Sequence, residues 1–441
     1  MNGFRPGGDR FTRALRAAAP ERVGVVTGAV GLGLSIAGLK GAPGDLIHLG
    51  DNIPDVAQVV GTGDGLMTCM PLVSTTSYPV GMPARAALNP PMVPTGSGLR
   101  GRVINGLGQP IDGRGPLTVG TFVPLEHSTP NPLDRSRIAA PVTLGVKAMD
   151  TLLTVGRGQR MGLFAGSGVG KSSLLSMIAR GTDAEVSVIG LIGERGREVR
   201  EFLEDDLGPE GLARSVVVVA TSDEPALMRL RAAFVATRIA ESFRDNGQDA
   251  VLMMDSLTRV AMAQREIGLS AGEPPATRGY PPSTFSVLAS LLERAGTDKT
   301  GSITGLYTVL VDGDDHNEPI ADAARSILDG HVVLDRKLAI NGHFPSIDVL
   351  ASVSRLASKL NSREQAAAAR TFRQVLSARR GAQDLLDVGA YKPGANALVD
   401  AGVAHETEMN QFLQQTMTEQ TTAESSWTSL IHLASTLGGT R

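Results

Sequence analysis

The sequence predicts a multi-domain protein with an N-terminal β-barrel, a central α/β domain and a small C-terminal α-helical domain. Three observations predict this architecture. Residues 22–95 hold short apolar runs broken by Gly and Pro, which is typical of a small barrel. Over residues 96–360, strand-like runs alternate with helical segments, which favours a mainly parallel sheet covered by helices. Strong helix formers dominate residues 361–441.

Five apolar runs are the expected strands of the central sheet. They are rich in Val, Ile and Met and show little polar alternation, as strands buried on both faces do. The runs are Arg160–Phe164, Val186–Ile192, Val216–Ala220, Ala250–Met254 and Thr304–Val311. Because parallel strands end at one common edge, catalytic loops are expected at that edge. The C-terminal helices are expected to break near Tyr391–Gly394.

The composition excludes several classes of protein. The chain has 441 residues and a single cysteine, Cys69, so it has no intrachain disulfide and no cysteine-based zinc site. No apolar run approaches the ~20 residues that span a bilayer, and no secretory signal pattern is seen. A net charge of −3 gives no global attraction to nucleic acid. A cytoplasmic protein is expected.

A phosphate-binding loop follows the first expected strand. Glycines allow consecutive backbone N–H groups to surround phosphate oxygens, Lys171 reaches the β- and γ-phosphates, and the Ser172 hydroxyl can bind Mg²⁺. Ala165 stands where the strict pattern has Gly, and an ordinary glycine-rich turn is the structural alternative. The expected nucleotide-binding residues of the loop are Ala165, Gly166, Ser167, Gly168, Val169, Gly170, Lys171, Ser172 and Ser173.

Two carboxylates follow other expected strands. Asp255 ends an apolar run, and in P-loop enzymes such a residue holds Mg²⁺. The alternative for Asp255 is a simple turn residue. Glu194 also follows a strand, and we expect it to polarise the water that attacks the γ-phosphate. The alternative for Glu194 is a surface carboxylate paired with Arg195 or Arg197.

Several segments together resemble one known family. The loop 165–172, Gly193–Arg195, Asp255–Arg259 and Val353–Arg355 resemble the catalytic subunits of rotary ATP synthases and the related export ATPases. Further segments resemble the type III secretion ATPases rather than synthase subunits. They are residues 272–282, 312–322 and 328–334. Residues 200–212 and 215–223 are more similar to the flagellar export members.

The resemblance implies an RecA-like domain that hydrolyses ATP with Mg²⁺ and works in a homohexameric ring. Lys171, Arg259 and Arg355 would then offset charge in the transition state, with Arg355 reaching in from the neighbouring subunit. Phe344 matches an aromatic residue that stacks on adenine, although its residue type alone favours a buried core position. Tyr391 aligns only loosely with the base pocket and is left out of it.

The resemblance also implies partners. Residues 1–21, with several arginines among apolar residues, would engage a stator-like negative regulator, and a frayed terminus is the alternative. The helical domain would face the export gate and meet chaperone–substrate complexes. A central stalk protein and peripheral association with the inner membrane are expected as well.

Three other functions share parts of this pattern. A hexameric RNA or DNA translocase would need stacking aromatics on the barrel, and the first 94 residues offer only Phe4, Phe11 and Tyr78. A rotary synthase catalytic subunit would share the catalytic residues, but the segment 313–319 argues against it. An injectisome-type secretion ATPase is the remaining alternative to a flagellar one.

Overall fold

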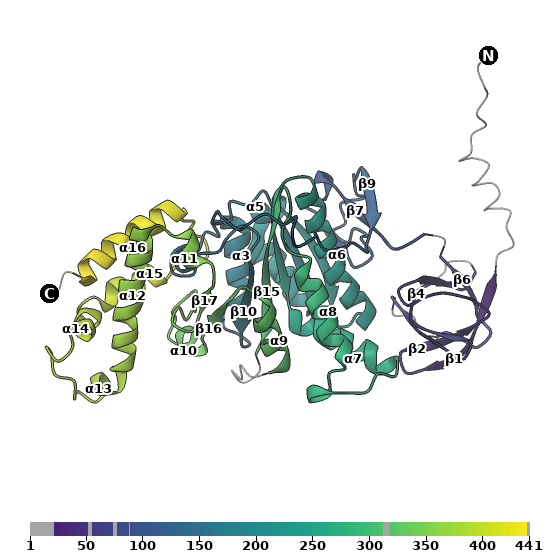
Figure 1. Ribbon diagram of the computed structural model, residues 1–441. Helices are drawn as coiled ribbons and strands as arrows, with labels where there is room; N and C mark the ends of the chain where they lie inside the picture. Colours follow the sequence, from purple (N-terminus) through teal and green to yellow (C-terminus); the bar gives the residue numbers. More distant parts are fainter. Residues whose placement is uncertain (1–21, 52–54, 74–76, 88, 312–317, 439–441) are drawn as a thin grey trace, which may run out of the picture. The chain divides into compact units, whose positions relative to one another are not determined.

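The structure is a computed structural model that describes residues 22–51, 55–73, 77–87, 89–311 and 318–438 (Figure 1). The expected partner-binding segment 1–21 and residues 312–317 of the family-specific segment lie outside the described residues. The chain divides into two compact units. The first runs to Pro91 and includes Ser270–Gly272, and the second contains the rest.

The first unit is a closed barrel, as predicted. Its strands are hydrogen-bonded in the order β1-β2-β5-β4-β3-β6. Alternate side chains point inward, and the thiol of Cys69 is among them, where burial raises its pKa to about 12. The strands are β1 (Val23–Val30), β2 (Gly33–Ala37), β3 (Leu46–Leu49), β4 (Asp55–Gly63), β5 (Leu66–Pro71) and β6 (Pro83–Ala86).

Residues 92–95 differ from the predicted division of the chain at residue 95. They form β7 (Met92–Thr95), which pairs with β9 (Thr121–Pro124) and belongs to the second unit. The compact units therefore separate after Pro91. β7 lies outside the barrel sheet because its backbone hydrogen bonds are made with residues 121–124.

The second unit contains a largely parallel sheet in the order β17-β16-β10-β15-β13-β11-β12-β8, and β17 is its antiparallel edge strand. All five predicted runs are strands of this sheet. A two-residue strand, β14 (Gly296–Thr297), pairs with β15 off this path. The main strands are β8 (Val103–Asn105), β10 (Arg160–Ala165), β11 (Val186–Glu194), β12 (Ser215–Thr221), β13 (Asp249–Asp255), β15 (Ser302–Leu310), β16 (Gly330–Leu334) and β17 (Val353–Ser354).

Helices cover both faces of this sheet. Ile189 of β11 belongs to the core under α3, whereas a Cβ at the next residue, Gly190, would lie 3.3 Å from Ala236 of α6. The helices are α2 (Lys147–Thr151), α3 (Lys171–Gly181), α4 (Gly196–Glu201), α5 (Gly208–Ala213), α6 (Ala226–Asp245), α7 (Leu257–Ser270), α8 (Pro282–Glu293), α9 (Pro319–Ile327) and α10 (Arg336–Ile340). Shorter helical turns are η1 (Ser97–Leu99), η2 (Phe202–Leu207) and η3 (Thr277–Gly279).

The C-terminal region is helical, as predicted, and it joins the core of the sheet domain rather than forming a separate unit. Ser362 and Gln365 form a capping box at the start of α12. Within residues 22–438 as described, no helix is long and apolar enough to cross a membrane. The helices are α11 (Ala357–Leu360), α12 (Arg363–Gly381), α13 (Gln383–Asp387), α14 (Ala397–Ala404), α15 (Glu406–Leu413) and α16 (Ala423–Gly438), so the predicted break at 391–394 lies between α13 and α14.

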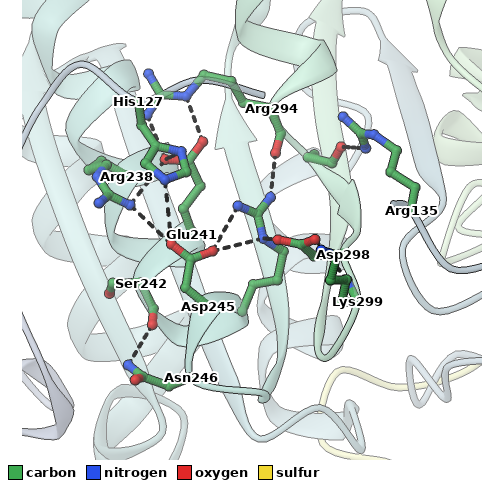
Figure 2. Close-up of polar contacts among 12 residues, drawn as sticks. His127, Arg135, Arg238, Glu241, Ser242, Asp245, Asn246, Arg294, Asp298 and Lys299 are labelled. Carbon is green, nitrogen blue, oxygen red and sulfur yellow. Dashed lines mark hydrogen bonds and ion pairs between the residues drawn. The ribbon is translucent and has the colours of Figure 1, made fainter. Parts of the chain in front are cut away.

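A buried ion-pair network fastens the segment after β9 to α6 and to the end of α8 (Figure 2). The carboxylate of Glu241 is fully buried and accepts two hydrogen bonds from Arg294, at 2.7 and 2.6 Å. Arg238 and His127 also lie within 3.4 Å of it. Both arginines donate in addition to the carbonyl oxygens of residues 124–125. Because α6 covers β11 and β13, this network supports the strands that carry the predicted carboxylates.

Candidate active site

The predicted phosphate-binding loop lies at the carboxyl edge of the sheet. β10 ends at Ala165, and α3 begins at Lys171. Gly168 and Gly170 have φ angles of 76° and 89°, a region that glycine enters without steric cost. A Cβ at Gly168 would meet no atom within 4 Å, so the loop leaves open space there. The loop can thus present its N–H groups and the N-terminus of α3 to an anion.

The two predicted carboxylates meet the lysine of this loop. Lys171 Nζ lies 2.6 Å from Asp255 Oδ1 and 3.1 Å from Glu194 Oε1. β13 and β11 are neighbours in the sheet and end at the same edge, which is why Asp255 and Glu194 come together. This cluster unites three residues that were predicted from separate parts of the sequence.

The cluster carries perturbed charges. Burial disfavours the ammonium form of Lys171, but Asp255 and Glu194 outweigh it, and the pKa of Lys171 is raised. Burial, reinforced by the Asp255 carboxylate, raises the pKa of Glu194 above its usual value even though Lys171 opposes this. A carboxylate with a raised pKa is better matched to proton exchange with water near neutral pH.

The alternative role for Glu194 does not hold in this structure. Arg195 pairs with Glu198 at 3.0 Å, and Arg197 pairs with Glu201. Both arginines lie at the start of α4, where residues three and four apart are neighbours, so they turn away from the end of β11. Glu194 therefore pairs with Lys171 rather than with either arginine.

Thr308 is a residue of the site that the sequence reasoning missed. It lies on β15, the strand between β10 and β13, and its hydroxyl is 2.7 Å from Asp255 Oδ1. The same hydroxyl is 3.2 Å from the carbonyl oxygen of Met254. Thr308 is fully buried, so its hydrogen bond to a charged carboxylate is shielded from water. The signal available in the sequence was a polar residue near the end of a buried strand.

Arg259 also reaches the edge of the cluster. A Cβ at Gly193 would lie 3.0 and 3.1 Å from Cβ and Cγ of Arg259, so the side chain passes directly over the residue before Glu194. Its Nε is buried and has no hydrogen-bond partner among the described residues. An unpaired buried N–H group is costly, and an anionic ligand would relieve that cost.

Phe344 is not the core residue that its type alone favours. Its side chain is 44% exposed, and a Cβ at Gly170 would lie 3.4 Å from two of its ring carbons. Ser346 donates a hydrogen bond of 2.6 Å to the carbonyl oxygen of Val169 in the loop. The exposed ring thus lies beside the phosphate-binding loop. Tyr391, in contrast, bonds within its own turn, to Asn396 and Asp400.

Arg355 lies at the other edge of the sheet. Its backbone N–H donates to Asp329, which in turn donates to Arg160, the first residue of β10. The six residues of β10 span about 20 Å between that edge and the phosphate-binding loop. Arg355 is therefore far from Lys171 of its own chain. Its side chain is exposed, and its guanidinium lies 3.4 Å from the carbonyl oxygen of Arg325.

The donor set near Lys171 suits a magnesium nucleotide. Ser172 and Asp255 offer oxygen ligands, which Mg²⁺ prefers, and Mg²⁺ usually takes only one or two of them from the protein. Among the residues described, no group of three or more His, Cys, Asp or Glu side chains is arranged to hold a metal ion.

A phosphate-binding loop on a parallel sheet, with carboxylates ending two adjacent strands, defines a P-loop nucleotide hydrolase. Comparisons with known proteins agree. Residues 145–354 match the nucleotide-binding domain of the ATP synthase alpha/beta family, and residues 361–432 match the T3SS EscN ATPase C-terminal domain. The chain belongs to the type III secretion ATPases, a group that includes the flagellum-specific ATP synthases, and it is an ATPase.

Individual relatives cover nearly the whole chain. It is 50% identical over 417 residues to the flagellum-specific ATP synthase of Bacillus subtilis, which covers 94% of this chain and 95% of that protein. It is 46% identical over 406 residues to the type 3 secretion system ATPase of Xanthomonas euvesicatoria, covering 90% and 91%. The solved structure of assembled EscN from enteropathogenic E. coli has a TM-score of 0.87 at 39% identity and covers 93% of this chain and 100% of that one.

Proposed function

We propose that this chain is the Mg²⁺-dependent ATPase of a flagellar protein export apparatus, where it assists unfolding and delivery of export substrates to a membrane gate. The contact of Lys171 with both Glu194 and Asp255 carries the proposal of catalysis. The flagellar assignment rests on similarity, since the B. subtilis flagellum-specific protein is 50% identical over 94% of this chain. An injectisome ATPase is the second candidate, because such a protein is 46% identical over 90% of it.

Each residue of the cluster has a role in hydrolysis. Glu194 orients and polarises the attacking water in line with the γ-phosphorus. Lys171 leaves the two carboxylates to bind the phosphates, and Arg259 adds positive charge beside Glu194. Ser172 and Asp255 would hold Mg²⁺, which would supply positive charge to neutralise the phosphates. Phe344 stacks on the nucleotide base.

The working unit that we propose is a homohexameric ring. Arg355 of one subunit would complete the site of the next, which agrees with its position at the opposite edge of the sheet from Lys171. EscN was solved in an assembled form and also in complex with its central stalk EscO. By analogy we propose a stalk partner here, a regulator bound by residues 1–21, and a cytoplasmic enzyme that associates peripherally with the inner membrane.

The barrel gives no support to a nucleic-acid translocase. In the described residues up to Pro91, Tyr78 is the sole Phe, Tyr or Trp, and it packs against the barrel core. A single-strand binding barrel needs exposed aromatics on which bases stack.

The first test measures steady-state ATP hydrolysis against protein concentration, with and without single-stranded RNA or DNA, using Lys171→Ala as the blank. Specific activity is expected to rise steeply with concentration, because the site needs a neighbouring subunit, and to be indifferent to nucleic acid. Strong stimulation by RNA or DNA would instead favour a translocase. Restoration of swimming in a flagellated strain that lacks its own export ATPase, without restoration of injectisome secretion, tests the flagellar assignment.

A further inference from the structure

A glutamine in the segment between α15 and α16 bonds that segment to the nucleotide-binding domain. Gln415 is only 5% exposed. Its side-chain oxygen accepts a hydrogen bond of 3.0 Å from the N–H of Lys147. Its amide nitrogen lies 2.8 Å from the carbonyl oxygens of Gly145 and of Glu419. The oxygen of the Gln415 amide therefore accepts one hydrogen bond, and its NH₂ group donates two.

The backbone of the same residue holds the turn that carries Phe344. The N–H of Gln415 donates to the carbonyl oxygen of Phe344 at 2.9 Å. Beside it, the amide nitrogen of Gln414 lies 3.4 Å from Nδ1 of His343, and burial lowers the pKa of that imidazole. From the other side, Ser346 is bonded to Val169 of the phosphate-binding loop.

Phe344 is therefore held between two supports. One support is the phosphate-binding loop. The other is Gln415, whose side-chain amide is hydrogen-bonded to the backbone of residues 145–147. Further contacts anchor the same segment. Lys147 Nζ pairs with Glu419 at 3.1 Å, and the guanidinium of Arg180, near the end of α3, donates to the carbonyl oxygen of Met417.

We propose that Gln415 is a positioning residue that sets the place of Phe344 and thereby the affinity for the nucleotide base. This rests on the proposed role of Phe344 in base stacking. Removing the amide takes the acceptor from the N–H of Lys147 and leaves the carbonyl oxygen of Gly145 with the Thr421 hydroxyl at 3.5 Å, so the segment moves and takes the backbone contact to Phe344 with it. Movement of α15 and α16 relative to the sheet is transmitted to the base through the same residue.

The test compares a ligand that has a base with one that lacks it. Binding of ADP and of pyrophosphate to the full-length protein is measured by titration calorimetry for the parent chain and for Gln415→Ala. We expect Gln415→Ala to weaken ADP binding about tenfold, the effect of roughly one buried hydrogen bond, and to leave pyrophosphate binding unchanged. In steady state, KM for ATP is expected to rise by a similar factor with little change in kcat.

Two further variants sharpen the comparison. Gln415→Glu keeps the shape and the acceptor but places a carboxylate against two carbonyl oxygens, so ADP binding is expected to be weak at neutral pH and to recover as the pH falls and the carboxyl becomes a donor. Gln383→Ala is the matched control, because the Gln383 side chain bonds to Arg379 and Asp387 within the helical region, and ADP binding of this variant is expected to equal that of the parent.

Each outcome has a definite meaning. Equal weakening of ADP and pyrophosphate by Gln415→Ala would overturn the proposal, because the residue would then support the whole domain. Unchanged ADP binding in both Gln415 variants, with a loss in Phe344→Ala, would overturn it while leaving the base role of Phe344 intact. Unchanged ADP binding in Phe344→Ala would instead remove the base role on which the proposal rests.

Discussion

Arg355 offers a quantitative prediction about subunit composition. The variant Arg355→Ala is expected to bind Mg-ATP but to lose turnover, since an arginine that stabilises transition-state charge contributes about 10³–10⁵-fold. The loss alone does not say which subunit uses the arginine. Mixing this variant with Glu194→Gln identifies the subunit that uses the arginine, because the two changes lie on opposite edges of the sheet.

The magnitude follows from the geometry. Lys171 and Arg355 of one chain are separated by about 20 Å of β10, so we expect each site to take its arginine from a neighbour. In a head-to-tail ring, a site in a mixed sample is intact only when an Arg355→Ala subunit supplies Glu194 and a Glu194→Gln subunit supplies Arg355. The intact fraction is the product of the two mole fractions, and at equal amounts it reaches about one quarter.

The assay is ATP hydrolysis of the two variants mixed at fixed total concentration over the full range of ratios. Specific activity is expected to trace a symmetric curve with a maximum of about one quarter of the parent value at equal amounts. Each variant mixed with the doubly substituted protein is the control, and those mixtures should stay inactive. Inactivity of the two single variants at every ratio would refute the reasoning that Arg355 acts across a subunit boundary.

Three further predictions concern other residues of the second unit. Glu194→Gln is expected to retain ATP binding and lose turnover, and undiminished hydrolysis would remove Glu194 from its role. Thr308→Val removes a hydrogen bond to charged Asp255 without changing volume, so the Mg²⁺ concentration for half-maximal activity should rise about tenfold or more. Thr308→Ser keeps the hydroxyl and should stay near the parent. A valine variant with the Mg²⁺ dependence of the parent would contradict this role of Thr308. Glu241→Ala leaves Arg294 buried without its partner and should cost about 3–5 kcal/mol in denaturant unfolding. Burial raises the pKa of Glu241, but Arg294 and His127 outweigh it and lower the pKa below the ordinary value of a glutamate. This stabilisation is therefore fully present above that ordinary value, about 4.3, and is lost as the pH falls through the folded pKa. An unfolding free energy with the same acid dependence in the variant would count against this reasoning.

The local sequence determined the elements that carry the chemistry. Val186–Ile192 and Ala250–Met254 are apolar with little alternation, which favours strands buried on both faces, and each is a strand in the structure. The glycines before Lys171 predicted a strand-to-helix loop for phosphate, and Gly168 and Gly170 do adopt positive φ. Such features depend on a few neighbouring residues, so the sequence alone predicts them.

Only the tertiary structure decided which side chains meet. Thr308 reaches Asp255 because β15 lies between β10 and β13, and strand order is set by how the whole sheet packs. The bond between Gln415 and Phe344 joins residues 71 positions apart in the sequence, and no local pattern marks it. Likewise, β7 pairs with β9 outside the barrel, although its sequence alone resembles the barrel strands. Pairings of this kind depend on long-range burial and hydrogen bonding, which residue type and spacing do not specify.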